Sequence, residues 1–223
     1  MKSVILRGED KFYSVGKIIC LGQNYAEHAR EMKFEVPASP VFFFKPPSAI
    51  IHNGGQIVLP EISNDVHHEV EMTVLIGEKG SHIHRSAALK HVAGYGIGLD
   101  LTMRDIQLEA KKKGLPWSLA KGFDTSAPVS EFIPAETVGD PGSFHVQLLI
   151  NGNLRQSSST DKFVFPVDKV ISYISQFITF EPGDIIFTGT PEGVSKITHG
   201  DKLEASLLDA NKNNLVSLSV SVE

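Results

Sequence analysis

The chain has 223 residues, of which 41% are hydrophobic and 21% charged, and its formal net charge is −5. This composition is typical of a globular protein with a sizeable core, and the negative balance argues against a nucleic-acid partner. The one cysteine, Cys20, excludes an intramolecular disulfide, lies in an apolar stretch typical of a buried thiol, and fits a reducing compartment.

The N-terminal sequence, MKSVILRGEDKFYSVGK, contains a short apolar stretch that is followed by charged residues. This stretch is too short for the core of a signal peptide. No part of the sequence has the roughly 20 consecutive apolar residues that a membrane helix needs. We therefore expect a cytoplasmic protein without a membrane partner.

Short β-rich runs dominate the rest of the chain, and turn sequences such as Asn53-Gly54-Gly55 and Asn151-Gly152 separate them. The runs expected to form strands are SVILR (3–7), KIICLG (17–22), PVFFF (40–44), QIVLP (56–60), EVEMTVLIG (69–77), GYGIGLDL (94–101), FHVQLLI (144–150), DIIFTGT (184–190), KLEASLL (202–208) and LVSLSVSV (215–222).

Three segments have helical patterns: 24–32, 102–114 and 167–179. Asn24 and Thr102 are the expected N-caps of the first two, and Gly114 is the expected stop of the second. The third carries an apolar stripe formed by Val167, Val170, Ile171, Ile174 and Ile178. The basic run 111–113 is expected to be the solvated last turn of the second helix.

Many strands with few helices do not make the regular alternation of a doubly wound fold. We therefore predict one mainly β domain of the α+β class, closed or layered, with helices on its rim.

Two carboxylates stand one strand repeat apart in SNDVHHEVEMTVLIG, residues 63–77. Alternation places Glu69 and Glu71 on one face, with His67 and Thr73, just before the strand becomes apolar on both faces. Like charges this close are costly unless water or a cation relieves them. For the pair alone, a solvated strand end is the simpler interpretation.

A third carboxylate, Asp100, lies within the run GYGIGLDL. Alternation puts Gly94, Gly96, Gly98 and Asp100 on one face, so another group can approach the backbone closely there. A strand that crosses tightly under another element is the equally simple alternative. With Glu69 and Glu71, the Asp100 carboxylate could complete a set of three oxygen ligands for one ion.

Three carboxylates completed by water suit a hard cation, Mg²⁺ or Mn²⁺, with Ca²⁺ as a further candidate. A zinc or iron site is the rival interpretation, because His67 shares a face with Glu69.

Several sequence blocks resemble one known family. HHEVEMTVLIG, GYGIGLDLTMRDIQ, KGFDTSAP and GDIIFTGTPEGV occur in the order found in the fumarylacetoacetate hydrolase family, and CLGQNYAEHAREM resembles its short acylpyruvase branch. The resemblance implies a mixed β-roll or sandwich of the family's C-terminal-domain type around a divalent metal, usually in a homodimer. We expect a single catalytic domain with a short N-terminal β segment (1–16), the matched core (17–204) and C-terminal strands (205–223).

The resemblance also implies roles for individual residues. Glu69, Glu71 and Asp100 match the three metal carboxylates of the family, with Mg²⁺ the usual ion. The matched catalytic residues are His28 and Glu31, whose i, i+3 spacing places both on one helical face, and Lys121 near the metal. The matched substrate-contacting residues are Arg104, Gln107 and Thr190. Gln23 departs from the family pattern, which bears on substrate choice.

The activity implied by the resemblance is Mg²⁺-dependent cleavage of a C–C bond in acylpyruvates, which are 2,4-dioxo acids such as acetylpyruvate or fumarylpyruvate. The products would be pyruvate and a carboxylic acid. His28, held by Glu31, would take a proton from the attacking water, and Lys121 would stabilise the developing oxyanion. Decarboxylation of oxaloacetate would form the same enolate and is a plausible second activity.

Three alternatives stay open at the level of sequence. The chain could be an isomerase of unsaturated dioxo acids, because enolisation needs only a metal and a base. It could also be a hydrolase of sugar-derived 2-oxo acids. A non-catalytic metal-binding dimer module is the third alternative, because a fold does not fix a function.

Overall fold

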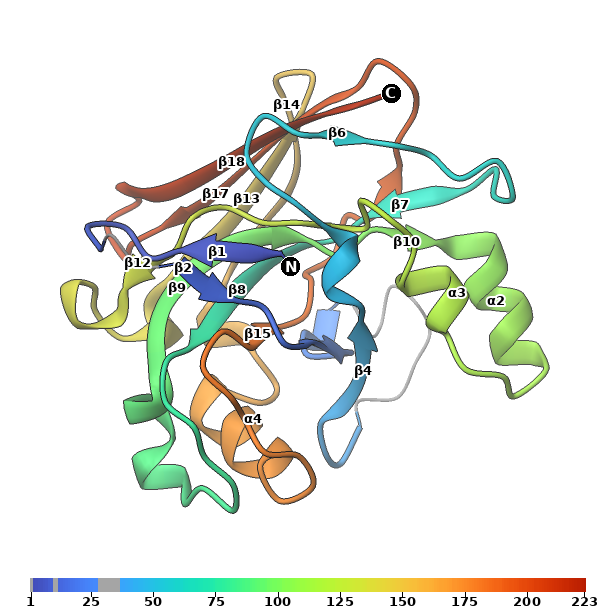
Figure 1. Ribbon diagram of the computed structural model, residues 1–223. Coiled ribbons are helices and arrows are strands. Elements are labelled where there is room, and N and C mark those ends of the chain that lie inside the picture. The colour runs from blue at the N-terminus through green and yellow to red at the C-terminus, as the bar shows by residue number, and fades with distance from the viewer. Residues whose placement is uncertain (1, 10–11, 28–36) are drawn as a thin grey trace.

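The computed structural model describes residues 2–9, 12–27 and 37–223. Its core consists of two mixed β-sheets that pack against each other, with helices at the rim (Figure 1). Strands of the second sheet contact β8 and β9 of the first, and one apolar cluster includes side chains from both sheets. The fold is thus mainly β with rim helices, as predicted, and its two layers stay open at their edges.

The first sheet has six strands and carries the candidate site. Its strands, in spatial order, are β12 (Ile133–Pro134), β9 (Val92–Leu99), β8 (Val70–Ile76), β15 (Ile185–Phe187), β3 (Ile18–Gly22) and β4 (Val41–Lys45). The β15–β3 pair is parallel and the other pairs are antiparallel. All seven residues of β8 are buried, which confirms that this strand is covered on both faces.

The second sheet has five strands: β14 (Asn153–Ser159), β13 (His145–Ile150), β17 (Lys202–Leu208), β18 (Asn214–Val222) and β6 (Gln56–Ile57). Alternate residues of β13 and β17 are buried, because one face of this sheet packs on the core. The remaining strands form short pairings: β1 (Ser3–Ile5) with β2 (Phe12–Ser14), β5 (Ile50–Ile51) with β11 (Ala127–Pro128), and β7 (Val66–His68) with β10 (Thr102–Met103) and β16 (Ser195–Lys196).

The described helices lie outside the sheets, with α2 and α3 together at one rim and α4 at another (Figure 1). The α-helices are α2 (Arg104–Lys112), α3 (Ser118–Lys121) and α4 (Val167–Ile174). The 3₁₀ helices are η1 (Pro47–Ala49), η2 (Arg85–His91), η3 (Ala135–Thr137), η4 (Pro141–Ser143) and η5 (Thr160–Lys162).

The predicted N-cap Thr102 is wrong, and the predicted N-cap Asn24 stays a prediction. Residues 26–27 are helical, but the Asn24 side chain donates to the carbonyls of Phe165 and Thr188 and accepts from the Phe165 amide, so it joins distant segments. Thr102 belongs to β10, and α2 begins at Arg104 without a side-chain cap. At Thr102 a strand pairing therefore takes the place of the expected local cap.

The third predicted helix is shorter than expected. α4 ends at Ile174, and its four stripe residues within the helix are buried, whereas Ile178 packs against the core from the following turns. The prediction for Cys20 is confirmed, because its thiol is fully buried. Within the part of the chain that the structure describes, no helix is long and apolar enough to cross a membrane.

Candidate active site

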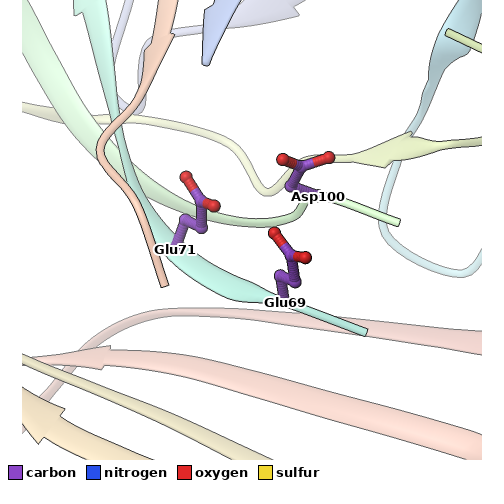
Figure 2. Close-up of side chains that lie close together, drawn as sticks. All are labelled: Glu69, Glu71 and Asp100. Carbon is purple, nitrogen blue, oxygen red and sulfur yellow. The ribbon is translucent and has the colours of Figure 1, made fainter. Parts of the chain in front are cut away.

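The register of β8 against β9 brings the three predicted carboxylates together. Glu71 pairs with Gly98, and the Asp100 amide donates to the Glu69 carbonyl over 2.9 Å just beyond the paired strand ends. Residues directly opposite in an antiparallel pair share a face, so the carboxylates converge. Figure 2 shows them gathered around one space, and one ligand oxygen from each lies within 4.8 Å of the others.

This cluster is buried, with 6%, 0% and 1% of Glu69, Glu71 and Asp100 exposed. Burial, and then the charges of Asp100 and Glu69, raise the pKa of Glu71 well above its usual value. Glu71 Oε2 accepts a hydrogen bond of 2.6 Å from the Gly189 amide, whereas no described residue is hydrogen-bonded to Oε1. Converging carboxylate oxygens, one of them without a hydrogen bond, fit a hard divalent cation.

Two buried lysines approach the cluster. Lys121 Nζ lies 3.0 Å from Glu69 Oε2 and 2.7 Å from Asp100 Oδ2, beside the carboxylates predicted to hold the metal. Burial opposes the charge of Lys121, but Asp100 and Glu69 outweigh this effect and raise its pKa. Lys45 Nζ lies 2.8 Å from Asp100 Oδ1 and donates to the Leu101, Lys121 and Ser126 carbonyls.

Sequence reasoning missed Lys45. The one available signal was a lysine that ends the apolar run VFFF on β4, which is an unusual place for a solvated charge. Gln156 on β14 was missed as well. Its Oε1 accepts from the Val70 amide over 3.0 Å and its Nε2 donates to Thr190 Oγ1 over 2.9 Å, so it ties two site segments to the second sheet.

Arg104 and Gln107 are buried on one face of α2, and Arg104 donates to Gln107 Oε1 over 2.9 Å. Arg104 also donates to Glu69 Oε1, so it forms an ion pair inside the site. Thr190 follows β15, and its hydroxyl donates to the Val70 carbonyl over 2.9 Å. The structure thus places all three predicted substrate-contacting residues beside the carboxylates, and their contact with a substrate stays a prediction.

Glu69, Lys121 and the three predicted substrate-contacting residues line one pocket. It is lined by Leu21, Gly22, Gln23, Phe43, Glu69, Arg104, Gln107, Lys111, Trp117, Lys121 and Thr190. Gln23, where the sequence departs from the family pattern, lies in this lining with a left-handed φ of 60°. A left-handed φ in a residue other than glycine costs free energy and is concentrated at functional sites.

The solvated last turn predicted for residues 111–113 is wrong for Lys111. Lys112 and Lys113 are exposed and lie 3.3 and 3.6 Å from the carboxylate oxygens of Glu109. Lys111 is half-buried in the pocket lining, with its Nζ 4.9 Å from the centre of the Trp117 ring. Burial, together with the charges of Arg104 and Lys121, lowers the pKa of Lys111 to about 8.

Two further predictions concern the glycine face beside Asp100 and His67 as a metal ligand. The group that approaches the glycine face beside Asp100 is the Phe187 side chain, because a Cβ on Gly98 would lie 2.7 Å from Phe187 Cε1. Within the described residues the carboxylate cluster does not include His67, whose Nε2 lies 3.0 Å from Asp65 Oδ1. The predicted dyad of His28 and Glu31 lies outside the described residues.

Known proteins resemble this chain over almost its whole length. The model of the fumarylacetoacetate hydrolase C-terminal family matches residues 17–222. The mouse protein named oxaloacetate tautomerase FAHD1, mitochondrial, is 46% identical over 198 residues, which cover 88% of this chain and 90% of the relative.

Solved structures agree with this family assignment. Fumarylpyruvate hydrolase from Pseudomonas aeruginosa, in a complex with Mn²⁺ and pyruvate, superposes with a TM-score of 0.92 and 36% identity, covering 99% of this chain and 95% of that one. The 5-carboxymethyl-2-hydroxymuconate delta-isomerase from Mycobacterium smegmatis has a TM-score of 0.82 and 34% identity, covering 95% and 80%.

The open two-layer β fold and the buried carboxylate–lysine cluster define a β-class enzyme domain with a candidate divalent-cation site. The chain belongs to the fumarylacetoacetate hydrolase family. This is a family of enzymes whose members here are named as hydrolase, isomerase and tautomerase. The division of the chain at residues 16 and 204 stays a prediction.

Proposed function

We propose that this chain is a Mg²⁺-dependent hydrolase that cleaves a C–C bond of acylpyruvates to give pyruvate and a carboxylic acid. The observation that carries the proposal is the buried cluster of Glu69, Glu71 and Asp100, whose Glu69 lines a pocket that also holds cationic side chains. The P. aeruginosa relative, whose structure contains Mn²⁺ and pyruvate, supports both the cation and the product class.

Glu69, Glu71 and Asp100 would hold the cation. Mg²⁺ is the ion that we propose, with Mn²⁺ or Ca²⁺ as alternatives, because all three prefer carboxylate and water oxygens. When bound, the cation supplies Lewis-acid polarisation of the 2-oxo acid. Within the chain, the Gly189 amide orients Glu71, and Arg104 orients Glu69.

The remaining site residues would bind the substrate and move protons. Lys121 presents a buried ammonium that can stabilise negative charge as it develops on the substrate. Arg104, Gln107 and Thr190 lie in the same lining and would orient the 2-oxo-carboxylate. We propose that His28, held by Glu31, takes the proton from the attacking water.

A second candidate function is conversion of oxaloacetate, by tautomerisation or decarboxylation. Curated relatives at 44% and 46% identity are named oxaloacetate tautomerases, which favours this candidate. Both reactions pass through an enolised 2-oxo acid, and neither requires attack by water. One site could therefore catalyse both the hydrolysis of acylpyruvates and the conversion of oxaloacetate. Only the hydrolysis would require His28 to activate a water molecule.

The decisive experiment measures pyruvate release from acetylpyruvate, fumarylpyruvate and oxaloacetate, with Mg²⁺ and then with excess EDTA. Loss of the enol absorbance of oxaloacetate is followed in parallel. EDTA-sensitive pyruvate release from a dioxo acid supports the hydrolase. Enol loss without pyruvate would replace the hydrolase with a tautomerase, and turnover that EDTA leaves unchanged would refute the metal-dependent proposal.

We also propose a homodimer that covers an apolar patch formed by Val41, Phe44 and Leu115. The three side chains are 39%, 45% and 55% exposed, and the first two lie on β4, an edge strand of the first sheet. Exposed apolar groups on a sheet edge are typical of an interface. Light scattering should report a dimer for the wild-type protein and a monomer for Phe44→Glu, whereas Phe177→Glu, at an exposed position outside this patch, should stay dimeric.

The cellular location stays a prediction. We propose a cytoplasmic protein, although the mouse and human relatives carry the word mitochondrial in their names. Fractionation of the source cells, with the protein detected by antibody, decides between the two compartments.

A further inference from the structure

Besides Arg104 and Lys121, the lining of the candidate pocket contains a third cation, Lys111. Lys111 lies near the C-terminal end of α2, within the lining that also contains Glu69 and Lys121. Its two neighbours along the chain, Lys112 and Lys113, are exposed and lie close to the Glu109 carboxylate. Lys111 is therefore the lysine of this basic run that faces the site.

Aromatic side chains position this ammonium. Lys111 Nζ lies 4.9 Å from the centre of the Trp117 ring, and the Trp117 and Phe43 rings pack edge to face with their centroids 5.8 Å apart. Lys121 Nζ in turn lies 4.9 Å from the centre of the Phe43 ring. The two ammonium groups thus stand at opposite ends of one aromatic pair, each in cation–π contact with its own ring.

The two ends of this arrangement have different surroundings. Lys121 is in direct contact with the carboxylates of Glu69 and Asp100, where the reacting end of a substrate would lie. Lys111 instead contacts the Trp117 ring; burial and then the charges of Arg104 and Lys121 disfavour its ammonium, whereas the charge of Glu69 favours it. An anion that enters the outer pocket would offset this repulsion, because opposite charges attract strongly where water is partly excluded.

We infer that Lys111 binds the distal carboxylate of a dianionic 2-oxo acid and thereby selects 2-oxo dicarboxylates over 2-oxo monocarboxylates. The reacting 2-oxo-carboxylate end would lie at the carboxylate cluster and Lys121, and the intervening carbons along Phe43 and Trp117. This inference rests on the proposed function, because it takes the pocket to be a 2-oxo acid site.

The test compares 2-oxoglutarate with 2-oxopentanoate, which has the same chain length and a methyl group in place of the distal carboxylate. Binding to the Mn²⁺-loaded protein is measured by calorimetry and by competition against turnover of oxaloacetate. We expect Lys111→Met to weaken 2-oxoglutarate about tenfold, the effect of losing one partly desolvated ion pair. The effect on 2-oxopentanoate should be several times smaller, and Lys111→Arg should retain most of the discrimination.

Lys112→Met is the matched control, because it removes a neighbouring charge that is exposed and lies outside the pocket lining. It should leave both affinities unchanged. Equal weakening of both acids by Lys111→Met, or wild-type protein that binds both equally, would overturn the inference and leave the 2-oxo acid site standing. Failure of the Mn²⁺-loaded wild type to bind or turn over any 2-oxo acid would overturn the proposed function together with the inference.

Discussion

Lys121 Nζ lies 2.7 Å from Asp100 Oδ2 and 3.0 Å from Glu69 Oε2, so it occupies the space between two of the three carboxylates. In the metal-free protein this ammonium compensates part of the negative charge of the cluster. A divalent cation in the same space would be repelled by it. The positive charge of Lys121 therefore affects the stability of the metal-free protein, its affinity for the metal and its activity.

Replacing Lys121 with methionine should separate these three properties. We expect Lys121→Met to bind Mn²⁺ about tenfold more tightly, because a competing positive charge is gone. Turnover should fall, and the metal-free protein should unfold at a lower temperature because the buried carboxylates lose their partner. Calorimetric titration with Mn²⁺ and thermal unfolding with and without EDTA check these outcomes; weaker Mn²⁺ binding would contradict the competition between the two cations.

Glu71→Gln should move stability and function in opposite directions. Glu71 is fully buried, and its raised pKa shows that the folded chain disfavours the ionised form. A neutral amide of the same shape should raise the free energy of unfolding of the metal-free protein by about 1–3 kcal/mol at pH 7. Mn²⁺ should stabilise the wild type against heat and leave the variant unaffected. A variant that is still stabilised by Mn²⁺ and still active would remove Glu71 from the proposed metal site.

His28→Ala should distinguish water-dependent chemistry from enolisation. If His28 activates water, the variant loses pyruvate release from acetylpyruvate by a factor of about 100 or more. Conversion of oxaloacetate should decline much less, because no water attacks it. Parallel assays of one variant preparation provide the comparison, and equal loss of both activities would argue for a different role of His28.

Gly98 should not accept a side chain, although it lies far from any turn. A Cβ there would lie 2.7 Å from Phe187 Cε1 and 2.9 Å from Thr73 Cγ2. Gly98→Ala should therefore destabilise the protein by about 1–3 kcal/mol through overpacking. Urea unfolding measures the effect, and Gly139→Ala is the control because no atom lies within 4 Å of its added Cβ. A Gly98→Ala protein as stable as its control would refute the close approach of the Phe187 side chain to Gly98.

Lys111 should give the metal-free protein a pH-dependent stability. Its pKa is lowered from 10.5 to about 8 in the folded chain. Between these values the unfolded chain binds more protons, so this group makes the free energy of unfolding rise with pH.

Lys111→Met removes that contribution. Because the group is half-buried, we expect the variant to be more stable at pH 7 by no more than about 1 kcal/mol. The difference should shrink toward pH 10.5. Urea unfolding at both pH values measures it, with Lys112→Met as control, and a pH-independent difference would refute the assignment.

The sequence by itself determined the strands and the residues of the carboxylate cluster. Alternation along one strand is a local property, so it placed Glu69 and Glu71 on one face without knowledge of any partner. The glycine-rich run added Asp100 as a third candidate ligand and the family resemblance added Lys121, and the structure brings both to the cluster. Helix ends were less predictable, since Asn24 and Thr102 have distant partners that no local pattern contains.

Only the tertiary structure decided which charges surround the cluster. The register of β8 against β9 fixes Asp100 beside Glu69, and the end of β4 brings Lys45 to Asp100 from 55 positions earlier in the chain, by the residue numbers. The same packing turns Lys111 toward Trp117 while Lys112 stays in solvent. The physical reason is that burial and electrostatic interaction depend on distance in space, whereas a sequence pattern records only distance along the chain.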